Sequence, residues 1–144
     1  IGTDAGTGYV HSVTATAANV SDITEAAHLM RPDDTAGWGD AGYLGVDKRE
    51  EITGDPHLAG VTWHIAARKS QLARMHPHER AIESRKAGVR AKVEHAFLIV
   101  KRDFGFTKTR YRGLAKNLHH LHVAFALANW LMRARAVALT TATA

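Results

Sequence analysis

The sequence contains no cysteine among its 144 residues. This absence excludes a disulfide scaffold, a thiol nucleophile and any metal centre that depends on thiolate ligands. Long hydrophobic runs are absent too: the longest uninterrupted apolar stretch covers residues 123–128, whereas a helix needs about 20 apolar residues to cross a bilayer. No basic-then-apolar signal segment opens the chain, so we expect a cytoplasmic protein without a membrane partner.

Charge is distributed very unevenly along the chain. The net charge is +5, yet residues 1–60 contain 10 acidic and 3 basic side chains, whereas residues 61–144 contain 4 acidic and 16 basic ones. A basic half of this kind indicates a polyanionic partner such as DNA, and the alternative is an ordinary solvated surface. Hydrophobic residues make up 45% of the sequence, which is typical of a globular domain.

The order of elements predicts a layered α/β domain over residues 1–135 and a disordered tail at 136–144. The last helix is apolar over most of its circumference, since Val123, Leu127 and Trp130 widen its apolar stripe, so it should be largely buried. Patterns of β-branched, apolar, glycine and proline residues place the individual elements. We expect a hairpin over residues 1–17, strands at 35–40 and 61–65, and helices at about 22–30, 47–52, 79–102 and 114–135.

Asp40 stands at the carboxyl end of the expected strand 35–40, directly before a turn that contains Gly42 and Gly45. Ligand sites of open α/β sheets gather at such strand ends. The two glycines allow backbone conformations that can hold a carboxylate close to a ligand, which makes Asp40 a candidate functional residue. The alternative is that Asp40 only caps the helical turn that follows it.

Glu94 lies on the expected helix 79–102, where helical spacing places Arg90 and Lys101 on nearly the same side. The apolar face of that helix is centred about 100° away, so Glu94 falls at the margin of the buried face. A carboxylate in this position can bind a metal ion while the neighbouring cations hold phosphates. The alternative is a solvated ion pair between Arg90 and Glu94, one helical turn apart.

Four segments in order resemble the catalytic domain of DDE-type transposases of bacterial insertion sequences, specifically the group around insertion sequences 4 and 5. The resemblance covers roughly residues 1–135. The third segment has the Arg–Glu–Lys spacing of the signature Tyr-x2-Arg-x3-Glu-x6-Lys, with Ala87 in the tyrosine position. The segments are residues 4–22, residues 39–45 with the family's second catalytic aspartate at Asp40, residues 90–101 with Arg90, Glu94 and Lys101, and residues 110–117.

The resemblance implies a ribonuclease-H-like fold, a mixed sheet with flanking helices, and DNA strand cleavage and strand transfer. It implies that Asp40 and Glu94 are catalytic and hold two Mg²⁺ ions, for which Mn²⁺ could substitute, and oxygen ligands suit these ions. The implied partners are the DNA of the element ends and of the target, with a homodimer on the DNA. We expect the DNA-binding residues to be Arg90, Lys101, Arg85, Lys86, Arg110 and Arg112.

One catalytic residue of the family has no match in the chain. The family's first catalytic aspartate lies on the central strand of the sheet, upstream of the hairpin, and Asp4 matches the aspartate of the hairpin turn instead. We therefore expect an N-terminally truncated catalytic domain that is inactive by itself. The alternatives are a non-catalytic DNA-binding remnant of a decayed element and a ribonuclease-H-like nuclease outside transposition.

Three weaker candidates remain open. His119 and His122 have the spacing of a metal-binding pair, although their apolar helix favours partly buried or DNA-facing histidines. Trp63 is either a residue that stacks on a base or a core residue. A basic segment predicts sequence-independent phosphate contacts by Arg68, Lys69, Arg74, Arg80, Arg85 and Lys86.

Overall fold

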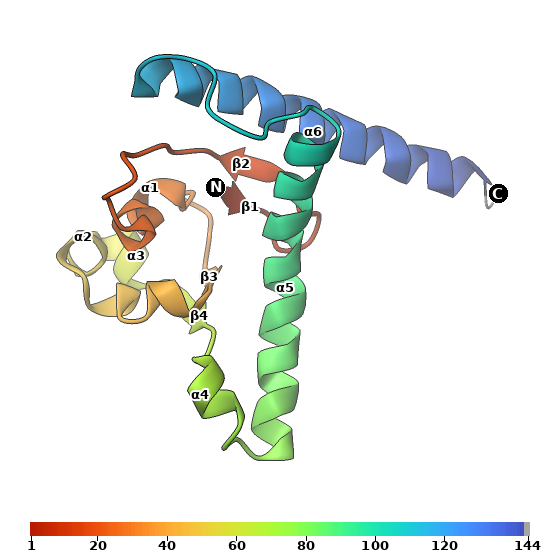
Figure 1. Cartoon of the computed structure of the whole chain (residues 1–144). Coiled ribbons are helices and arrows are strands. Elements are labelled where there is room, and N and C mark those ends of the chain that lie inside the picture. The colour runs from red at the N-terminus through yellow and green to blue at the C-terminus, as the bar shows by residue number, and fades with distance from the viewer. Residues whose placement is uncertain (143–144) are drawn as a thin grey trace. The chain divides into compact units, whose positions relative to one another are not determined.

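The computed structural model describes residues 1–142 and contains both strands and helices, as the α/β prediction requires (Figure 1). These residues divide into two compact units. The first unit combines residues 1–17 with the residues from Lys92 onward, and the second unit consists of Ala18–Ala91. None of the helices in the described part of the chain has the length and hydropathy that a membrane span needs.

In the first unit the predicted hairpin is present with shorter arms than expected. Strand β1 (Gly2–Thr3) pairs antiparallel with β2 (Val10–Ser12). The turn between them is closed by Asp4, whose Oδ1 accepts hydrogen bonds from the backbone N–H of Thr7 at 2.6 Å and from its hydroxyl at 2.7 Å. Aspartate commonly has this role in turns, so Asp4 is a structural residue of the hairpin.

The helix expected at 79–102 is confirmed as α5 (Pro77–Arg102), and its residues from Lys92 onward belong to the first unit. Gly105, with a φ of 64°, follows its end in the left-handed conformation that glycine adopts after a helix. The C-terminal part of α5 packs against β2 and α6 (Leu114–Ala142). The buried core of this unit consists of Val10, Ala96, Ile99, Val100, Ala124, Phe125 and Ala128.

Helix α6 is longer and less buried than the sequence predicted. The expectation of a disordered tail was wrong for residues 136–142, which continue the helix because their alanines and leucine favour it; residues 143–144 lie outside the described residues. The expectation of a largely buried helix was also wrong. The side chains of Val123 and Trp130 are 59% and 71% exposed, because one face of α6 packs on the core and the opposite face does not.

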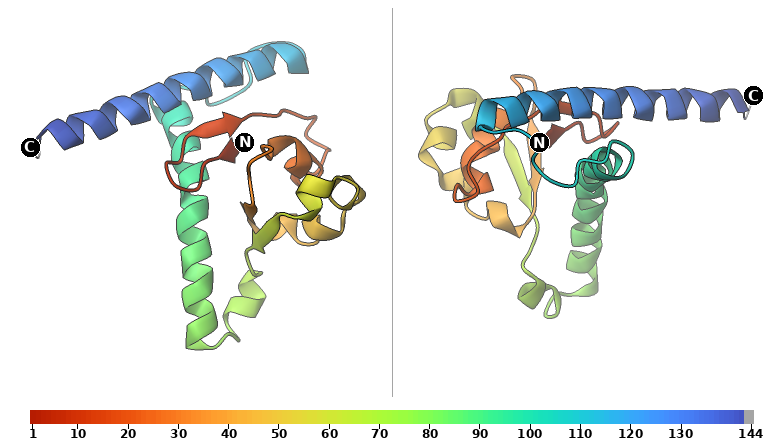
Figure 2. Two further views of the ribbon diagram at one scale, coloured as in Figure 1. Left: turned by 180° about the vertical axis from the view of Figure 1, so that it is seen from behind. Right: turned by 45° about the horizontal axis from the view of Figure 1, so that its top comes forward.

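In the second unit both predicted strands are present, as β3 (Ala36–Gly39) and β4 (Thr62–Ile65), and they pair in parallel. Parallel strands need a crossover connection, which short helical turns provide here (Figure 2). Extended backbone at Arg49 interrupts the helix expected at 47–52. The short helices are η1 (Asp22–Glu25) and α1 (Ala26–Leu29) before β3, η2 (Ala41–Tyr43), η3 (Val46–Lys48), α2 (Glu50–Thr53) and α3 (Pro56–Ala59) in the crossover, and α4 (Lys69–Leu72) after β4.

Trp63 belongs to the packing of the second unit. Its indole ring lies over Gly37 of the neighbouring strand, where a Cβ atom would come within 2.7 Å of the ring. It packs against a buried cluster from the short helices, as a core tryptophan does. That cluster consists of Ala26, Val46, Ile52 and Leu58.

Backbone hydrogen bonds connect β1 with β2 and β3 with β4, so residues 1–142 contain two separate two-stranded sheets. The single mixed sheet of a ribonuclease-H-like fold is not formed within this part of the chain. Sequence patterns located the strands and paired the two arms of the hairpin, but they did not give the parallel pairing of β3 with β4, because the pairing of distant strands depends on which neighbours are available.

Candidate functional site

Asp40 lies directly after β3 and is the N-terminal cap of the 3₁₀ helix η2. Its Oδ1 accepts a hydrogen bond from the backbone N–H of Gly42 at 2.8 Å. A Cβ atom at position 42 would lie 3.0 Å from this oxygen, so glycine gives the carboxylate room to fold back over the turn. Asp40 therefore caps the helical turn, as the alternative interpretation of the sequence predicts. The cap uses one oxygen of the carboxylate, and the residue is exposed to solvent.

The surroundings of Asp40 are negatively charged on the side of η2. Tyr43 in the same turn has a raised pKa, chiefly because the phenol is partly buried and further because Asp22 and Asp40 lie near it. Neighbouring carboxylates disfavour a phenolate in this way, and the same field attracts cations.

A cavity of about 720 Å³ in the second unit opens beside Asp40. It lies at the carboxyl ends of the two parallel strands, where ligand sites of α/β folds occur, and small side chains such as Ala87 leave its space free. Two acidic and three basic side chains line it. They are Asp40, Glu83, Lys69, Arg80 and Arg90.

Arg90 lines this cavity with a donor that has no partner. Its Nε atom is buried and forms no hydrogen bond within the described residues. Leaving a buried donor unpaired costs about 1–3 kcal/mol. Because the Nε atom is closed off from solvent, a ligand oxygen reaches it only if the side chain moves, and what Arg90 offers an anion in the cavity is its positive charge.

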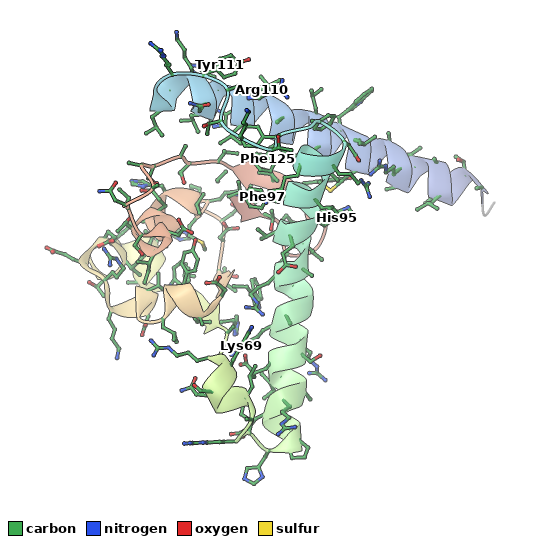
Figure 3. All side chains as sticks on the ribbon, in the orientation of Figure 1. Lys69, His95, Phe97, Arg110, Tyr111 and Phe125 are labelled. Carbon is green, nitrogen blue, oxygen red and sulfur yellow. The ribbon has the colours of Figure 1, made fainter. Side chains whose placement is uncertain are left out.

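The other two basic side chains that line the cavity, Arg80 and Lys69, differ in whether they already form hydrogen bonds within the protein. Arg80 is held in place, because its Nε donates to the Met75 carbonyl at 3.1 Å and its Nη2 donates to the Ala73 carbonyl at 3.2 Å. Lys69 lies at the start of α4 (Figure 3), and its exposed ammonium group makes no ion pair or hydrogen bond to the residues that the structure describes. Lys69 is thus available to a ligand.

Glu83 is a residue of the cavity that sequence reasoning missed. Its Oε2 accepts a hydrogen bond from the Ala67 N–H at 2.9 Å, and its Oε1 pairs with the Lys86 ammonium at 2.7 Å. The bond from Lys86 is the main cause of the lowered pKa of Glu83. Lys86 also donates to the Ile65 carbonyl at 3.1 Å, so the pair fastens α5 to the end of β4.

Lys86 is one of the residues that the sequence predicts to bind DNA, and that role stays a prediction. Its ammonium group is occupied by Glu83 and by the backbone of β4. Arg85, its neighbour, is exposed. The i,i+3 spacing of Glu83 and Lys86 was the available signal for the pair, but sequence spacing could not show that both reach the backbone of residues 65–67.

Glu94 lies one helical turn after Arg90 on α5, and it belongs to the first unit, whereas Asp40 belongs to the second. Its carboxylate is exposed and forms no ion pair in the described structure, so the alternative ion pair with Arg90 is not formed. Lys101 is exposed too, with its ammonium 5.7 Å from the centre of the Phe97 ring. Within residues 1–142 no group of three or more His, Asp or Glu side chains is placed to hold a metal ion.

The remaining predicted residues lie on α6 and on the loop before it, in the first unit. Arg110 and Arg112 are exposed on the loop. His119 and His122 are exposed on α6, and the described residues offer them no metal-binding group.

Comparison with known proteins identifies the family to which the chain belongs. The model of the transposase DDE domain matches residues 1–130, which include Asp40 and its turn, the cavity and the Arg90–Glu94 segment. No solved structure matches the chain. Because the family model covers most of the sequence, the chain belongs to the transposase DDE domain family.

Proposed function

We propose that this chain acts in DNA transposition and that Asp40 and Glu94 supply two of the metal-binding carboxylates for DNA strand cleavage and strand transfer. The observation that carries the proposal is the position of Asp40. It lies at the carboxyl end of a parallel strand, beside a cavity that Arg90 and Lys69 also line.

The donor chemistry of these residues fits Mg²⁺ or Mn²⁺, which take oxygen ligands. Capping uses Oδ1 of Asp40, which leaves Oδ2 for a metal ion, and the carboxylate of Glu94 is exposed. When bound, two divalent ions stabilise the attacking and leaving oxygens of an in-line phosphoryl displacement. The chain's own residues position the substrate, since Arg90 and Lys69 can hold phosphate oxygens beside Asp40.

A complete site of this kind needs a third carboxylate. The described residues contain no group of three that could hold a metal ion, and the family resemblance places the third ligand on a central strand that is not among the four described here. Such a strand would also have open edges to pair with, since β3 and β4 form a sheet of two strands. We therefore propose that this chain by itself does not cleave DNA.

The proposed partner is DNA, bound through its phosphates and, in the intact transposase, by a homodimer. The basic second half of the sequence supports this, as does the exposure of Arg85, Lys101, Arg110 and Arg112. Affinity that comes from phosphate contacts falls steeply with salt.

Two measurements test the proposed function. Mn²⁺ binding, followed by isothermal titration calorimetry, should weaken in Glu94→Gln and stay unchanged in Glu50→Gln, a matched control on α2. Duplex DNA binding by the unsubstituted chain should be strongly salt-dependent. Binding of DNA without any dependence of Mn²⁺ affinity on Glu94 would favour the non-catalytic remnant, and Mg²⁺-dependent nicking by the chain alone would contradict the proposed inactivity.

A further inference from the structure

The loop between α5 and α6 is a second candidate surface, distinct from the cavity at Asp40. From residue 104 to residue 142 the sequence contains no aspartate or glutamate. Four cations gather around the loop and the first turn of α6, and all four are exposed. They are Lys108, Arg110, Arg112 and Lys116.

An aromatic ring lies in the middle of these cations. Tyr111 stands between Arg110 and Arg112, and its side chain is 50% exposed. The ring packs against His120 of α6 at right angles, with the ring centres 5.3 Å apart. Tyr111 is thus supported by α6 while half of its surface stays open to solvent.

The backbone on either side of Tyr111 is fixed. Asn117 accepts a hydrogen bond from the Tyr111 N–H at 3.3 Å, and its Nδ2 donates to the carbonyls of Tyr111 and Gly113, each at 2.7 Å. Arg110 donates from Nη2 to the Gly105 carbonyl at 3.3 Å, which holds the preceding part of the loop. Side-chain hydrogen bonds therefore hold the backbone that carries Tyr111, which reduces the entropy that this backbone loses on binding.

We propose that Tyr111 is a base-stacking residue of a surface that binds single-stranded DNA, with Arg110 and Arg112 contacting the flanking phosphates. Exposed aromatic rings among cations are the usual platform for unpaired nucleic acid. In a duplex the base faces are already stacked, so a tyrosine ring reaches them only where the strands are separated. The choice of DNA rests on the proposed function, in which strand cleavage and transfer leave DNA ends that can separate.

The test compares one labelled 12-nucleotide single strand with its duplex by fluorescence anisotropy, using the whole chain at low salt. Tyr111→Ala should weaken single-strand binding about 5- to 150-fold, because each stacked base contributes about 1–3 kcal/mol. Duplex binding should change less than about twofold. Tyr111→Phe, which keeps the ring, should retain single-strand affinity, and Trp130→Ala, which removes an exposed ring elsewhere on α6, should leave it unchanged.

The outcomes separate this inference from the proposed function. Equal losses for single strand and duplex in Tyr111→Ala, or no loss for either, overturn the stacking role. An equal effect of Trp130→Ala overturns it as well. If the unsubstituted chain binds neither form of DNA, both proposals fail. If it binds both and Tyr111→Ala changes nothing, the stacking role alone fails. Far-UV circular dichroism shows whether each variant keeps its helices.

Discussion

The side-chain amide of Asn129 on α6 pairs with both backbone groups of Val10 in β2. Its Oδ1 accepts the Val10 N–H at 2.8 Å, and its Nδ2 donates to the Val10 carbonyl at 2.7 Å. A neighbouring strand would use the same two backbone groups, so one side chain takes the place of a strand at this residue. The pairing attaches the hairpin to α6 next to the buried core of the first unit.

Replacing Asn129 by leucine should destabilise the chain. The substitution leaves a donor and an acceptor of the half-buried backbone without partners, at about 1–3 kcal/mol for each group. We expect the free energy of unfolding in urea to fall by about 2–6 kcal/mol. The neighbouring Trp130→Ala change, on the exposed face, should stay within about 0.5 kcal/mol, and an equally mild Asn129→Leu would show that water satisfies Val10.

Glu83 should make stability depend on pH in the acidic range. Its pKa is lowered from an ordinary 4.5, chiefly by the hydrogen bond from Lys86. A carboxyl whose pKa is lower in the folded state stabilises it above the unfolded pKa, and this contribution is lost as pH falls through the folded value. The stability difference between the unsubstituted chain and Glu83→Gln should therefore be largest near pH 7 and shrink below about pH 4.

Urea unfolding of both chains at several pH values measures this difference. Because Glu51 and Asp103 also have lowered pKa values, the pH dependence of the unsubstituted chain alone cannot be assigned to Glu83. Glu50→Gln is the matched control, since it removes an exposed carboxylate of α2 that forms no ion pair with the described residues. A Glu83→Gln difference that stays constant from pH 7 to pH 3 would mean that the carboxylate acts only through its size and position.

Local patterns were sufficient for the features that depend on nearby residues. The glycine-containing turn predicted the hairpin. The spacing of apolar residues predicted α5, with a start that differs from the observed one by two residues. Asp40 could be placed at a strand end because the segment changes there from β-forming residues to a glycine-rich turn. The sequence could not decide between capping and metal binding, because both roles use a carboxylate in the same place.

Features that depend on distant neighbours could not be predicted. Glu83 bonds to the backbone of Ala67, sixteen residues earlier, and no local pattern specifies such a contact. The apolar circumference of α6 indicated burial, but burial depends on how many elements pack around a helix. Arg90 is a further example. Its spacing from Glu94 predicted on which side of the helix its charge lies, but only the structure shows that its Nε is a buried donor without a partner.

Arg90 should bind DNA through its shape as well as its charge. Arg90→Lys keeps the positive charge and removes the buried Nε–H, and a lysine cannot form the paired contacts of a guanidinium to a phosphate. We expect duplex DNA affinity to fall about fivefold or more. Arg85→Lys is the matched control on the exposed side of the same helix and should stay within about twofold. Equal losses of DNA affinity in the two variants would mean that Arg90 contributes to binding only through its positive charge.

The two roles of Asp40 can be separated by substitution. Asparagine caps a helical turn about as well as aspartate, whereas alanine does not. Asp40→Asn should therefore keep the stability of the chain and lose Mn²⁺ binding, and Asp40→Ala should lose Mn²⁺ binding and about 1 kcal/mol of stability as well. Asp55 offers a matched control, because its carboxylate caps α3 by accepting the His57 N–H at 2.8 Å. Asp55→Asn should change neither property, and Mn²⁺ affinity that survives in Asp40→Asn would leave Asp40 with the capping role alone.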